Sequence, residues 1–301
     1  MTEFLKEIIQ KNLGKIEENV SLQKYTTYKV GGVCRALIYP KDIDKLVEIL
    51  RLIEKYKIPY KIIGNGSNLL FSDKEYNGVL LKLNFLNKLE IIGNKVIVGA
   101  GYPLIKLSLL TAKHALTGLE FASGIPGTIG GAIFMNAGAY KSDMGYITSS
   151  IKVITKDLQI ITLTNNELDF HYRTSFLKKH PEYICIEATL KLNYGKKSEI
   201  EKVIKDRRER RIKSQPLEYP SAGSVFRNPE EIPAGKLIED LGLKGVTKGG
   251  AEVSKKHANF IINAKQATAQ DIKELIEYVH DTVLKEYNID LKVEQEFVNW
   301  E

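Results

Sequence analysis

The chain has few cysteines and no long apolar run. Its two cysteines, Cys34 and Cys185, belong to no C-x-x-C pair or metal-ligand spacing and have apolar neighbours, so we expect buried, reduced thiols. No apolar stretch approaches the length of a membrane span, and the N-terminal sequence MTEFLKEIIQKN lacks the apolar core of a signal peptide. These absences predict a cytoplasmic protein with no metal site and no membrane partner.

A strong excess of either charge is also absent. The 301 residues include 44 Lys and Arg against 37 Asp and Glu, a net charge of +7. The local cluster of Arg207, Arg208, Arg210 and Arg211 is interleaved with acids on a predicted helix, which indicates a solvated face. The charge suits an anionic small molecule at least as well as a nucleic acid. Because no basic stripe carries stacking aromatic residues, we expect no nucleic-acid partner.

Hydrophobic periodicity predicts both helices and strands. In residues 41–57 the apolar side chains fall on one helical face, and a second helix is expected over 103–116, with its proline in the first turn. Short apolar runs predict strands, and Gly93-Asn94 predicts a two-residue hairpin between two of them. A final strand is expected over 290–298. The mixture predicts an α+β fold.

The composition changes near residue 195. The first part mixes helices with many strands, whereas a charged helix is expected over 196–214, with Ser198 and Glu201 as its capping box. An irregular stretch rich in Pro, Gly and Ser follows. A last long helix over 268–287 begins with its own Thr-x-x-Asp capping pattern. We therefore place a domain boundary near residue 195, followed by a smaller α+β unit.

Residues 62–70, IIGNGSNLL, place a glycine turn directly after a predicted strand. The glycines allow a tight turn with exposed N–H groups, which would suit a diphosphate. The pattern is neither a full G-x-G-x-x-G nor a P-loop, so on its own an ordinary turn is the more frequent explanation. The candidate residues are Gly64, Asn65, Gly66, Ser67 and Asn68.

Residues 121–140, FASGIPGTIGGAIFMNAGAY, are both glycine-rich and apolar. The five glycines would let main chain approach a ligand closely, and the apolar side chains could cover a flat ring system. FAD has both a charged diphosphate and an apolar tricycle, and would fit such a loop. Tight packing between helix and sheet explains the residue types equally well.

These two loops and five further segments resemble the UDP-N-acetylenolpyruvoylglucosamine reductase family (MurB). They follow the family's order and cover most of the chain. The segments are YTTYKVGG (25–32), IIGNGSNLLFSD (62–73), GLEFASGIPGTIGGAIFMNAGAY (118–140), YRTSF (172–176), SAGSVFRNP (221–229), AGKLIEDLGLKG (234–245) and GGAEVSKKHANFIIN (249–263).

The resemblance implies an FAD-binding domain of the vanillyl-alcohol-oxidase type, with two α+β subdomains, followed by an α+β substrate-binding domain. On this chain we expect an N-terminal helical segment over 1–20 and the FAD-binding domain over 21–195, with subdomains of about 21–85 and 86–195. The substrate-binding domain would span 196–301. The chain has no room for the Tyr-bearing insertion of some members, so it resembles the shorter subtype.

The implied reaction is a flavin-dependent reduction in peptidoglycan precursor synthesis. NADPH would reduce non-covalent FAD, which would pass hydride from N5 to C3 of UDP-N-acetyl-3-O-(1-carboxyvinyl)-glucosamine to give UDP-N-acetylmuramate. The partners would be this UDP-sugar and NADPH, and a monomer is expected. Two alternatives stay open: an FAD oxidase of the same fold acting on an alcohol, and a non-enzymatic nucleotide-binding module.

By resemblance, three residues carry the chemistry. Ser224 would supply the proton to C2, and Arg173 would stabilise the enolate and carboxylate with its guanidinium fork. Glu294 would share a proton with the substrate carboxylate. From residue types alone, a local backbone hydrogen bond would explain Ser224 and a surface salt bridge would explain Arg173. Glu296 falls on the same face of the expected strand, and the register favours Glu294 over it.

The resemblance also implies ligand-binding residues. Flavin contacts beyond the first glycine turn are expected from Gly124, Ile125, Pro126, Gly127, Thr128, Gly130, Gly131, Asn136, Gly138 and Ala139. Substrate contacts are expected from Tyr172, Arg227, Asn228, Lys236, His257 and Asn259. An ordinary surface histidine would explain His257 about as well, and it has no partner at metal-ligand spacing.

Overall fold

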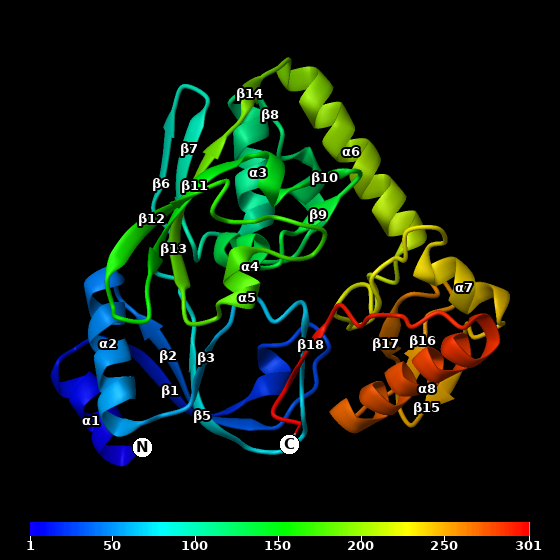
Figure 1. Ribbon diagram of the computed structural model, residues 1–301, viewed down its shortest axis with the longest axis horizontal. Coiled ribbons are helices and arrows are strands. Elements are labelled where there is room, and N and C mark those ends of the chain that lie inside the picture. The colour runs from blue at the N-terminus through cyan, green and yellow to red at the C-terminus, as the bar shows by residue number, and fades with distance from the viewer. Residues whose placement is uncertain (301) are drawn as a thin grey trace. The chain divides into compact units, whose positions relative to one another are not determined.

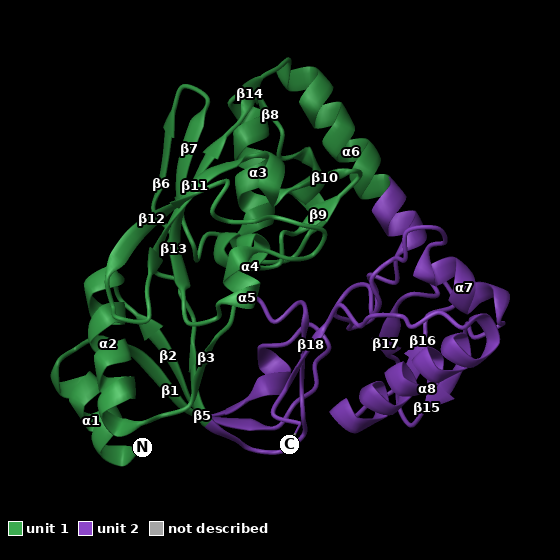
Figure 2. Cartoon of the chain, viewed as in Figure 1, with its two compact units in different colours: residues 1–18, 36–64, 78–209 green, residues 19–35, 65–77, 210–301 purple. Residues whose placement is uncertain are grey.

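The chain forms two compact units that alternate along the sequence, and the computed structural model describes residues 1–300 (Figure 1). Unit 1 comprises residues 1–18, 36–64 and 78–209 (Figure 2). Unit 2 comprises residues 19–35, 65–77 and the chain from 210 onward. Helices and strands occur together in both units, which confirms the expected α+β class.

Two larger sheets, two short two-stranded sheets and several helices form unit 1. The elements are α1 (Thr2–Gln10), β1 (Gly14–Ser21), β2 (Val33–Pro40), α2 (Ile43–Tyr56), β3 (Tyr60–Ile62), β5 (Tyr76–Leu81), β6 (Leu89–Ile92), β7 (Lys95–Gly99), α3 (Leu104–Lys113), β8 (Leu116–Thr117), η2 (Glu120–Gly124), α4 (Ile129–Phe134), β9 (Gly138–Ala139), β10 (Ser142–Asp143), η3 (Met144–Tyr146), β11 (Thr148–Ile154), β12 (Ile160–Thr164), α5 (Phe176–Lys179), β13 (Ile184–Lys191), β14 (Asn193–Tyr194) and α6 (Lys197–Ser214). The sheet orders are β12-β11-β13-β7-β6 and β1-β2-β5-β3. Strands β1, β2 and β5 and helix α6 each cross a boundary between the units.

Sequence patterns account for several of these elements. Ile92 pairs with Lys95 across the β6–β7 turn, which confirms the Gly93-Asn94 hairpin. Helix α2 buries Leu46, Leu50 and Ile53, as its periodicity predicts. Helices α3 and α4 lie beside the five-stranded sheet (Figure 1), and apolar side chains from all these elements form one continuous core.

Unit 2 is organised around one long helix. Its elements are η1 (Leu22–Lys24), β4 (Leu69–Phe71), α7 (Ala234–Asp240), β15 (Thr247–Lys248), β16 (Ala251–Val253), β17 (Ile261–Asn263), α8 (Ala269–Tyr287) and β18 (Glu296–Val298). The predicted capping box of Thr268 and Asp271 begins α8 and is confirmed. Tyr28, Val30 and Leu70 belong to the same apolar core as α8, which explains why two early segments belong to this unit.

Three local predictions need correction. Helix α6 begins at Lys197, so Ser198 is inside the helix and does not cap it. Helix α3 begins at Leu104, with the proline at the N-cap position, and it ends at Lys113. The expected strand over 290–298 is reduced to β18, because residues before it bond to the 225–227 segment instead of a continuous strand.

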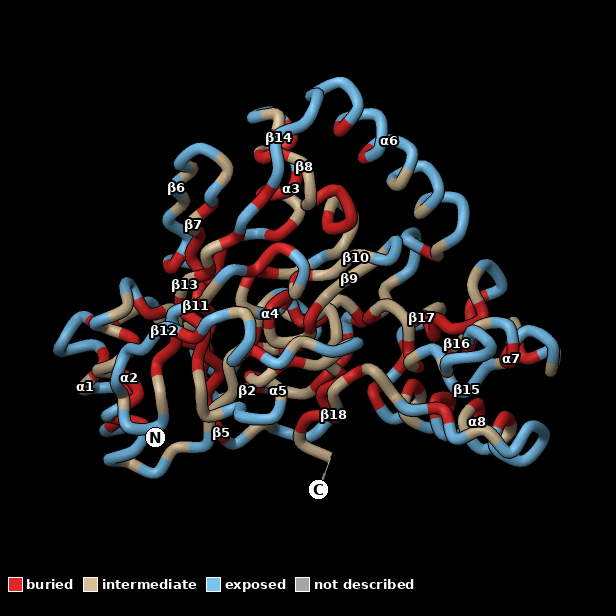
Figure 3. The backbone as a smooth tube through the Cα atoms, turned by 45° about the horizontal axis from the view of Figure 1, so that its top comes forward, coloured by how far each residue is buried: buried red, intermediate tan, exposed pale blue. Residues whose placement is uncertain are grey.

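Exposure along α6 follows its charge pattern. Figure 3 shows most of this helix as exposed, and Arg208 and Arg210 confirm the expected solvated face. Arg207 is half-buried, and its guanidinium lies 4.8 Å from the ring centroid of Tyr140. The domain boundary expected near residue 195 falls just before α6 and stays a prediction.

Candidate active site

The two glycine-rich loops meet in unit 1. A Cβ atom added to Gly64 would lie 2.8 Å from Oγ1 of Thr128, so main chain of the first loop approaches the second loop directly. The buried Lys82 donates a 2.5 Å hydrogen bond from Nζ to the Gly64 oxygen. Burial lowers the pKa of Lys82. This lysine fixes the position of the first glycine turn, a role that sequence patterns did not reveal.

Packing within the protein accounts for part of the second loop. A Cβ atom added to Gly130 would lie 3.1 Å from the Cβ of Ala100, and one added to Gly138 would lie 2.5 Å from the Cβ of Asp143. Gly138 begins the short β9–β10 hairpin. Close packing therefore explains these two glycines without any ligand.

Two glycines of the same loop have no such explanation. A Cβ atom on Gly127 would meet nothing within 4 Å among the described residues, and one on Gly131 would meet only Oγ1 of Thr128, at 3.5 Å. Thr128 caps α4 and accepts from the Gly131 N–H. Bare main chain next to open space at these positions fits close approach by a diphosphate or a flat ring.

The other predicted flavin residues of this loop lie on either side of α4. Gly124 closes η2, and Ile125 and Pro126 follow it, whereas Ala139 lies in β9. The first glycine turn is partly in unit 2, where Asn65, Gly66, Ser67 and Asn68 lie. Gly66 has a φ of +63°, and a Cβ atom there would lie 2.2 Å from the Tyr25 oxygen, so this position requires glycine for folding alone.

Arg173 lies in a tight turn with a left-handed backbone. His171 and Thr174 exchange main-chain hydrogen bonds of 3.0 and 3.1 Å, which close the turn around Tyr172 and Arg173. The φ of Arg173 is +56°, a conformation that ordinarily favours glycine or asparagine. Its Nη2 donates to the Gly138 oxygen at 2.9 Å, and its guanidinium lies 5.0 Å from the centroid of the exposed Tyr172 ring.

Polar side chains tie this turn to the end of the second loop. Asn136 is buried, and its Nδ2 donates to the His171 oxygen at 2.9 Å. The Oδ1 of Asn136 accepts from the Gly145 N–H at 2.9 Å. The buried Ser175 donates from Oγ to the Phe134 oxygen at 2.8 Å. The amide of Asn136 thus bonds to protein on both sides.

In unit 2, the segment around Ser224 is fixed by side chains distant in sequence. Asn259 is buried and uses both ends of its amide on Phe226: Oδ1 accepts from its N–H at 2.9 Å, and Nδ2 donates to its oxygen at 2.8 Å. The buried Gln295 donates to the Ala222 oxygen at 3.3 Å. Within residues 1–300, the Ser224 hydroxyl makes no hydrogen bond to another protein group, and its role stays a prediction.

Two hydrogen bonds to the main chain of Glu294 place it beside the same segment. The Glu294 N–H donates to the Val225 oxygen at 2.8 Å, and Nδ2 of Asn68 donates to the Glu294 oxygen at 3.1 Å. Glu296 follows two residues later and pairs with Leu69 in the parallel β18–β4 ladder. The first glycine turn, Glu294 and the residue after Ser224 therefore share one hydrogen-bonded frame.

The remaining predicted substrate residues lie around α7. Asn228 accepts from the Ala234 N–H at 3.1 Å through its Oδ1, and Lys236 pairs with Asp240, which raises the pKa of this exposed lysine. His257 is half-buried, and burial lowers its pKa, so its ring is neutral near pH 7. Its Nδ1 accepts from the Asn259 N–H at 3.2 Å.

Sequence reasoning did not single out two further residues of this frame. Tyr28 is fully buried and donates from its hydroxyl to Oε1 of Gln295 at 3.0 Å, and burial raises its pKa. Tyr28 lies in the YTTYKVGG segment, and Gln295 separates the two glutamates considered for catalysis. A glutamine between two glutamates is visible in the sequence, but its burial and its hydrogen bond with Tyr28 cannot be found without the fold.

The described residues show neither a metal site nor a membrane-spanning helix. Among residues 1–300, no group of three or more His, Cys, Asp and Glu side chains is placed to hold a metal ion. No helix in the same residues combines the length and the apolar character that crossing a membrane requires.

The loops and the fold of unit 1 define a flavin-binding oxidoreductase. A family model described as an FAD binding domain matches residues 34–164, and a model of the C-terminal domain of UDP-N-acetylenolpyruvoylglucosamine reductase matches residues 215–298. The FAD-binding domain of the vanillyl-alcohol-oxidase type is thus confirmed, as is the separate C-terminal domain.

Full-length relatives give the same result. A protein named UDP-N-acetylenolpyruvoylglucosamine reductase from Anoxybacillus flavithermus is 46% identical over 299 residues, which are 99% of each chain. One from Bacillus cereus, named UDP-N-acetylenolpyruvoylglucosamine reductase 1, is 44% identical over the same shares. The crystal structure of UDP-N-acetylenolpyruvylglucosamine reductase (MurB) from Thermus caldophilus matches with a TM-score of 0.82 and 34% identity, over 94% of this chain and 99% of that one. This chain belongs to the UDP-N-acetylenolpyruvoylglucosamine reductase family, and it is an FAD-dependent reductase of peptidoglycan synthesis.

Proposed function

We propose that the chain reduces the enolpyruvyl ether of UDP-N-acetylglucosamine to UDP-N-acetylmuramate, with NADPH as the reductant. One observation in unit 2 supports the roles of the catalytic residues: the Glu294 N–H bonds directly to the oxygen of Val225, the residue after Ser224. When bound, FAD would supply the redox chemistry, as the carrier of hydride between NADPH and C3 of the enolpyruvyl group.

Residues of unit 1 hold the cofactor in this proposal. Gly127 and Gly131 leave the space that a phosphate or ring needs, and Thr128 fixes the start of α4 next to Gly64. The main chain of both glycine loops supplies N–H donors without side chains in the way. Lys82 holds the first loop in register through the Gly64 oxygen.

Ser224 gives a proton to C2 of the substrate as hydride reaches C3. An alcohol is a weak acid, but the enolate-like carbon that develops at C2 is a strong base and can take its proton once the two are aligned. Asn259 and Gln295 fix the main chain on both sides of Ser224. The absence of a protein partner for its hydroxyl among residues 1–300 supports this role.

Arg173 stabilises the negative charge that spreads into the substrate carboxylate. A guanidinium offers paired donors that match a carboxylate, and it stays charged at any working pH. Its left-handed backbone supports a functional role, because a strained residue persists where a specific side chain must be presented.

Glu294 is the better candidate for the catalytic carboxylate. Its main chain bonds to Val225, whereas Glu296 pairs with Leu69 in the β18–β4 ladder. Glu294 is therefore adjacent to the Ser224 segment along a direct hydrogen bond. We propose that it shares a proton with the substrate carboxylate.

The substrate's diphosphate and sugar are assigned to residues around α7 and the 227–228 segment. Lys236 and Arg227 supply positive charge, and Asn228 and the neutral His257 supply hydrogen bonds. Asn259 contributes chiefly by holding Phe226. Tyr172 covers Arg173 and, being half exposed, can contact substrate. We further propose a cytoplasmic monomer of the shorter subtype.

Anaerobic absorbance of the purified flavoprotein tests this function. NADPH should bleach the flavin band, and addition of the enolpyruvyl UDP-sugar should restore it with formation of UDP-N-acetylmuramate. A flavin that an alcohol reduces and oxygen reoxidises, with no response to the UDP-sugar, would indicate the oxidase. Protein that binds no flavin would exclude both enzymes.

A further inference from the structure

Asn136 lies in the predicted flavin loop, yet both ends of its amide bond to protein. The side chain is 2% exposed, its Nδ2 donates to the His171 oxygen, and its Oδ1 accepts from the Gly145 N–H. Its own backbone is left-handed, with a φ of +43°. A buried amide with both a donor and an acceptor used in this way holds two chain segments at a fixed distance.

One of those two segments is the turn that presents Arg173. His171 is the first residue of this turn, and its main-chain bonds with Thr174 force Arg173 into the left-handed region. Such a conformation persists only where its surroundings fix it. The hydrogen bond from Asn136 to the His171 oxygen fixes the first residue of this turn to the second glycine-rich loop.

The guanidinium itself is held by the same loop. Nη2 of Arg173 donates to the oxygen of Gly138, two residues after Asn136. Ser175, two residues beyond Arg173, donates to the oxygen of Phe134, two residues before Asn136. Three successive contacts therefore join the loop over 134–138 to the turn over 171–175, and Asn136 occupies the middle one.

We propose that Asn136 is a positioning residue that sets the orientation of Arg173 towards the substrate carboxylate, in place of the flavin contact expected from its loop. The inference rests on the proposed role of Arg173. Loss of the amide would let the turn move, and a displacement of about 1 Å at a charge-stabilising group can slow a reaction about a hundredfold. The flavin loop itself would keep its bare glycines and its capped helix.

The test is a double-mutant cycle on the two half-reactions, with Asn136→Ala, Arg173→Ala and the double variant. Asn136→Ala should bind FAD with wild-type affinity and be bleached by NADPH at the wild-type rate. Reoxidation by the enolpyruvyl UDP-sugar should slow by about tenfold to a hundredfold. In the Arg173→Ala background the same change should slow reoxidation by less than about twofold, because the group that Asn136 orients is already absent.

Asn165→Ala is the matched control. This asparagine also donates two hydrogen bonds, from Nδ2 to the Gly145 and Thr148 oxygens, and neither of them is to the 171–174 turn. It should lose stability without a selective loss in reoxidation. If Asn136→Ala does not fold, Asn136→Asp replaces it, since it keeps an acceptor for Gly145 and loses the amide donor to His171.

Two outcomes are distinguishable. Full additivity of Asn136→Ala and Arg173→Ala, or weakened FAD binding by Asn136→Ala, overturns the positioning role and leaves the proposed reaction intact. Wild-type reoxidation in Arg173→Ala alone overturns the role of the arginine on which the inference rests.

Discussion

Asn68 donates a 3.1 Å hydrogen bond from Nδ2 to the main-chain oxygen of Glu294, a residue 226 positions further along the chain. The Asn68 oxygen in turn accepts from the Glu296 N–H at 2.9 Å. Asn68 belongs to the glycine turn, and Glu294 is the proposed catalytic carboxylate. One asparagine thus joins a predicted cofactor loop to the segment that carries the acid.

Asn68→Ala should therefore impair the substrate half-reaction selectively. Loss of the amide frees the Glu294 main chain, and we expect reoxidation of the reduced flavin by substrate to slow by about tenfold or more. Bleaching by NADPH should change much less. Asn299→Gly is the control, since Asn299 ties the end of the same segment to Ser72 and Glu75. Equal loss in both half-reactions of Asn68→Ala would count against the frame.

Gly127→Ala should weaken FAD binding without weakening the fold. Apart from its chain neighbours, the added methyl meets no atom of residues 1–300 within 4 Å, so apoprotein should unfold at the wild-type temperature while the Kd for FAD rises about tenfold or more. Gly101→Ala is the opposite case, because its Cβ would lie 1.8 Å from the Leu83 oxygen and must destabilise the apoprotein. Fluorescence titration and thermal unfolding measure both effects. Wild-type FAD affinity in Gly127→Ala would remove the main support for the loop assignment.

Arg173→Gly should separate stability from activity. Glycine relieves the left-handed backbone, so this variant should exceed Arg173→Ala in free energy of unfolding by about 1 kcal/mol. Both should lose substrate reduction, because both lack the guanidinium. Urea denaturation of the two apoproteins gives the comparison. Equal stability would show that the turn stores no strain at Arg173.

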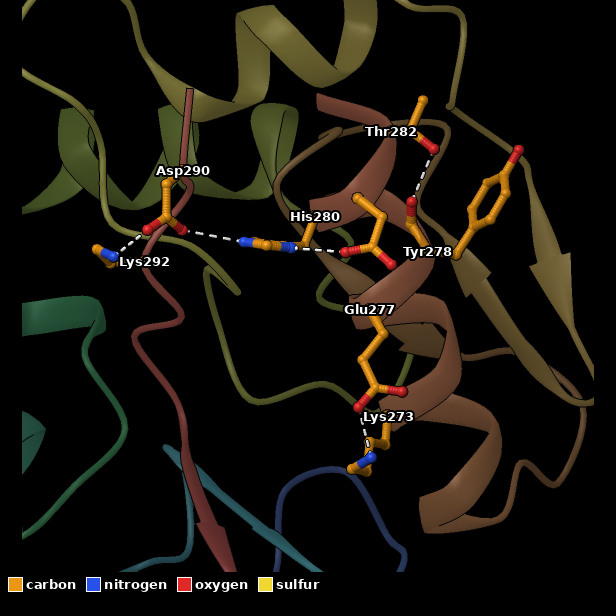
Figure 4. Close-up of polar contacts among 8 residues, drawn as sticks. Lys273, Glu277, Tyr278, His280, Thr282, Asp290 and Lys292 are labelled. Carbon is orange, nitrogen blue, oxygen red and sulfur yellow. Dashed lines mark hydrogen bonds and ion pairs between the residues drawn. The ribbon is translucent and has the colours of Figure 1, made fainter. Parts of the chain in front are cut away.

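His280 should make the stability of unit 2 depend on pH. One ring nitrogen of His280 contacts Asp290 at 3.0 Å (Figure 4), and the other contacts Asp281 at 2.9 Å. The hydrogen bonds to Asp290 and then Asp281 raise the pKa of His280 above the ordinary 6.5. A raised pKa in the folded state gives stability that is fully present below the unfolded pKa and is lost as pH rises through the folded one. Lys292 also pairs with Asp290 and remains when His280 is neutral.

The matching experiment compares wild type with His280→Gln in urea at about pH 6 and about pH 9. The difference in free energy of unfolding should be larger at the lower pH, where the imidazolium holds Asp290 and the segment that leads to Glu294. A difference that does not vary with pH would show that the histidine acts only by packing.

Local signals in the sequence predicted most of the helices. The apolar face of α2, the Thr268–Asp271 capping box and the Gly93-Asn94 turn depend on residues close together in the chain. These features can therefore be predicted from the sequence alone. Ser198 does not cap α6, because this helix begins at Lys197, two residues before the start that the capping pattern indicates. The 290–298 strand failed because its partners, around Val225 and Asn68, are far away in sequence.

The sequence predicts a list of residues for the candidate site, but it does not predict what fixes each of them in place. Gly66 and Gly138 are required by close main-chain contacts and Gly130 packs tightly against Ala100, whereas Gly127 and Gly131 have room for a side chain. Those five positions look alike in sequence, because the difference depends on what lies opposite each Cα atom. The supporting amides of Asn136 and Gln295 likewise act through partners that only the fold brings near.

Anaerobic stopped-flow absorbance of Ser224→Ala tests the central claim most directly. The account predicts that NADPH bleaches this variant at the wild-type rate, because the hydroxyl has no part in flavin reduction. Recolouring by the enolpyruvyl UDP-sugar should slow by about 10²- to 10⁴-fold, the usual contribution of a positioned proton donor. Recolouring at the wild-type rate would contradict the assignment of Ser224 as the acid, and equal slowing of both half-reactions would show a defect in folding or flavin binding instead.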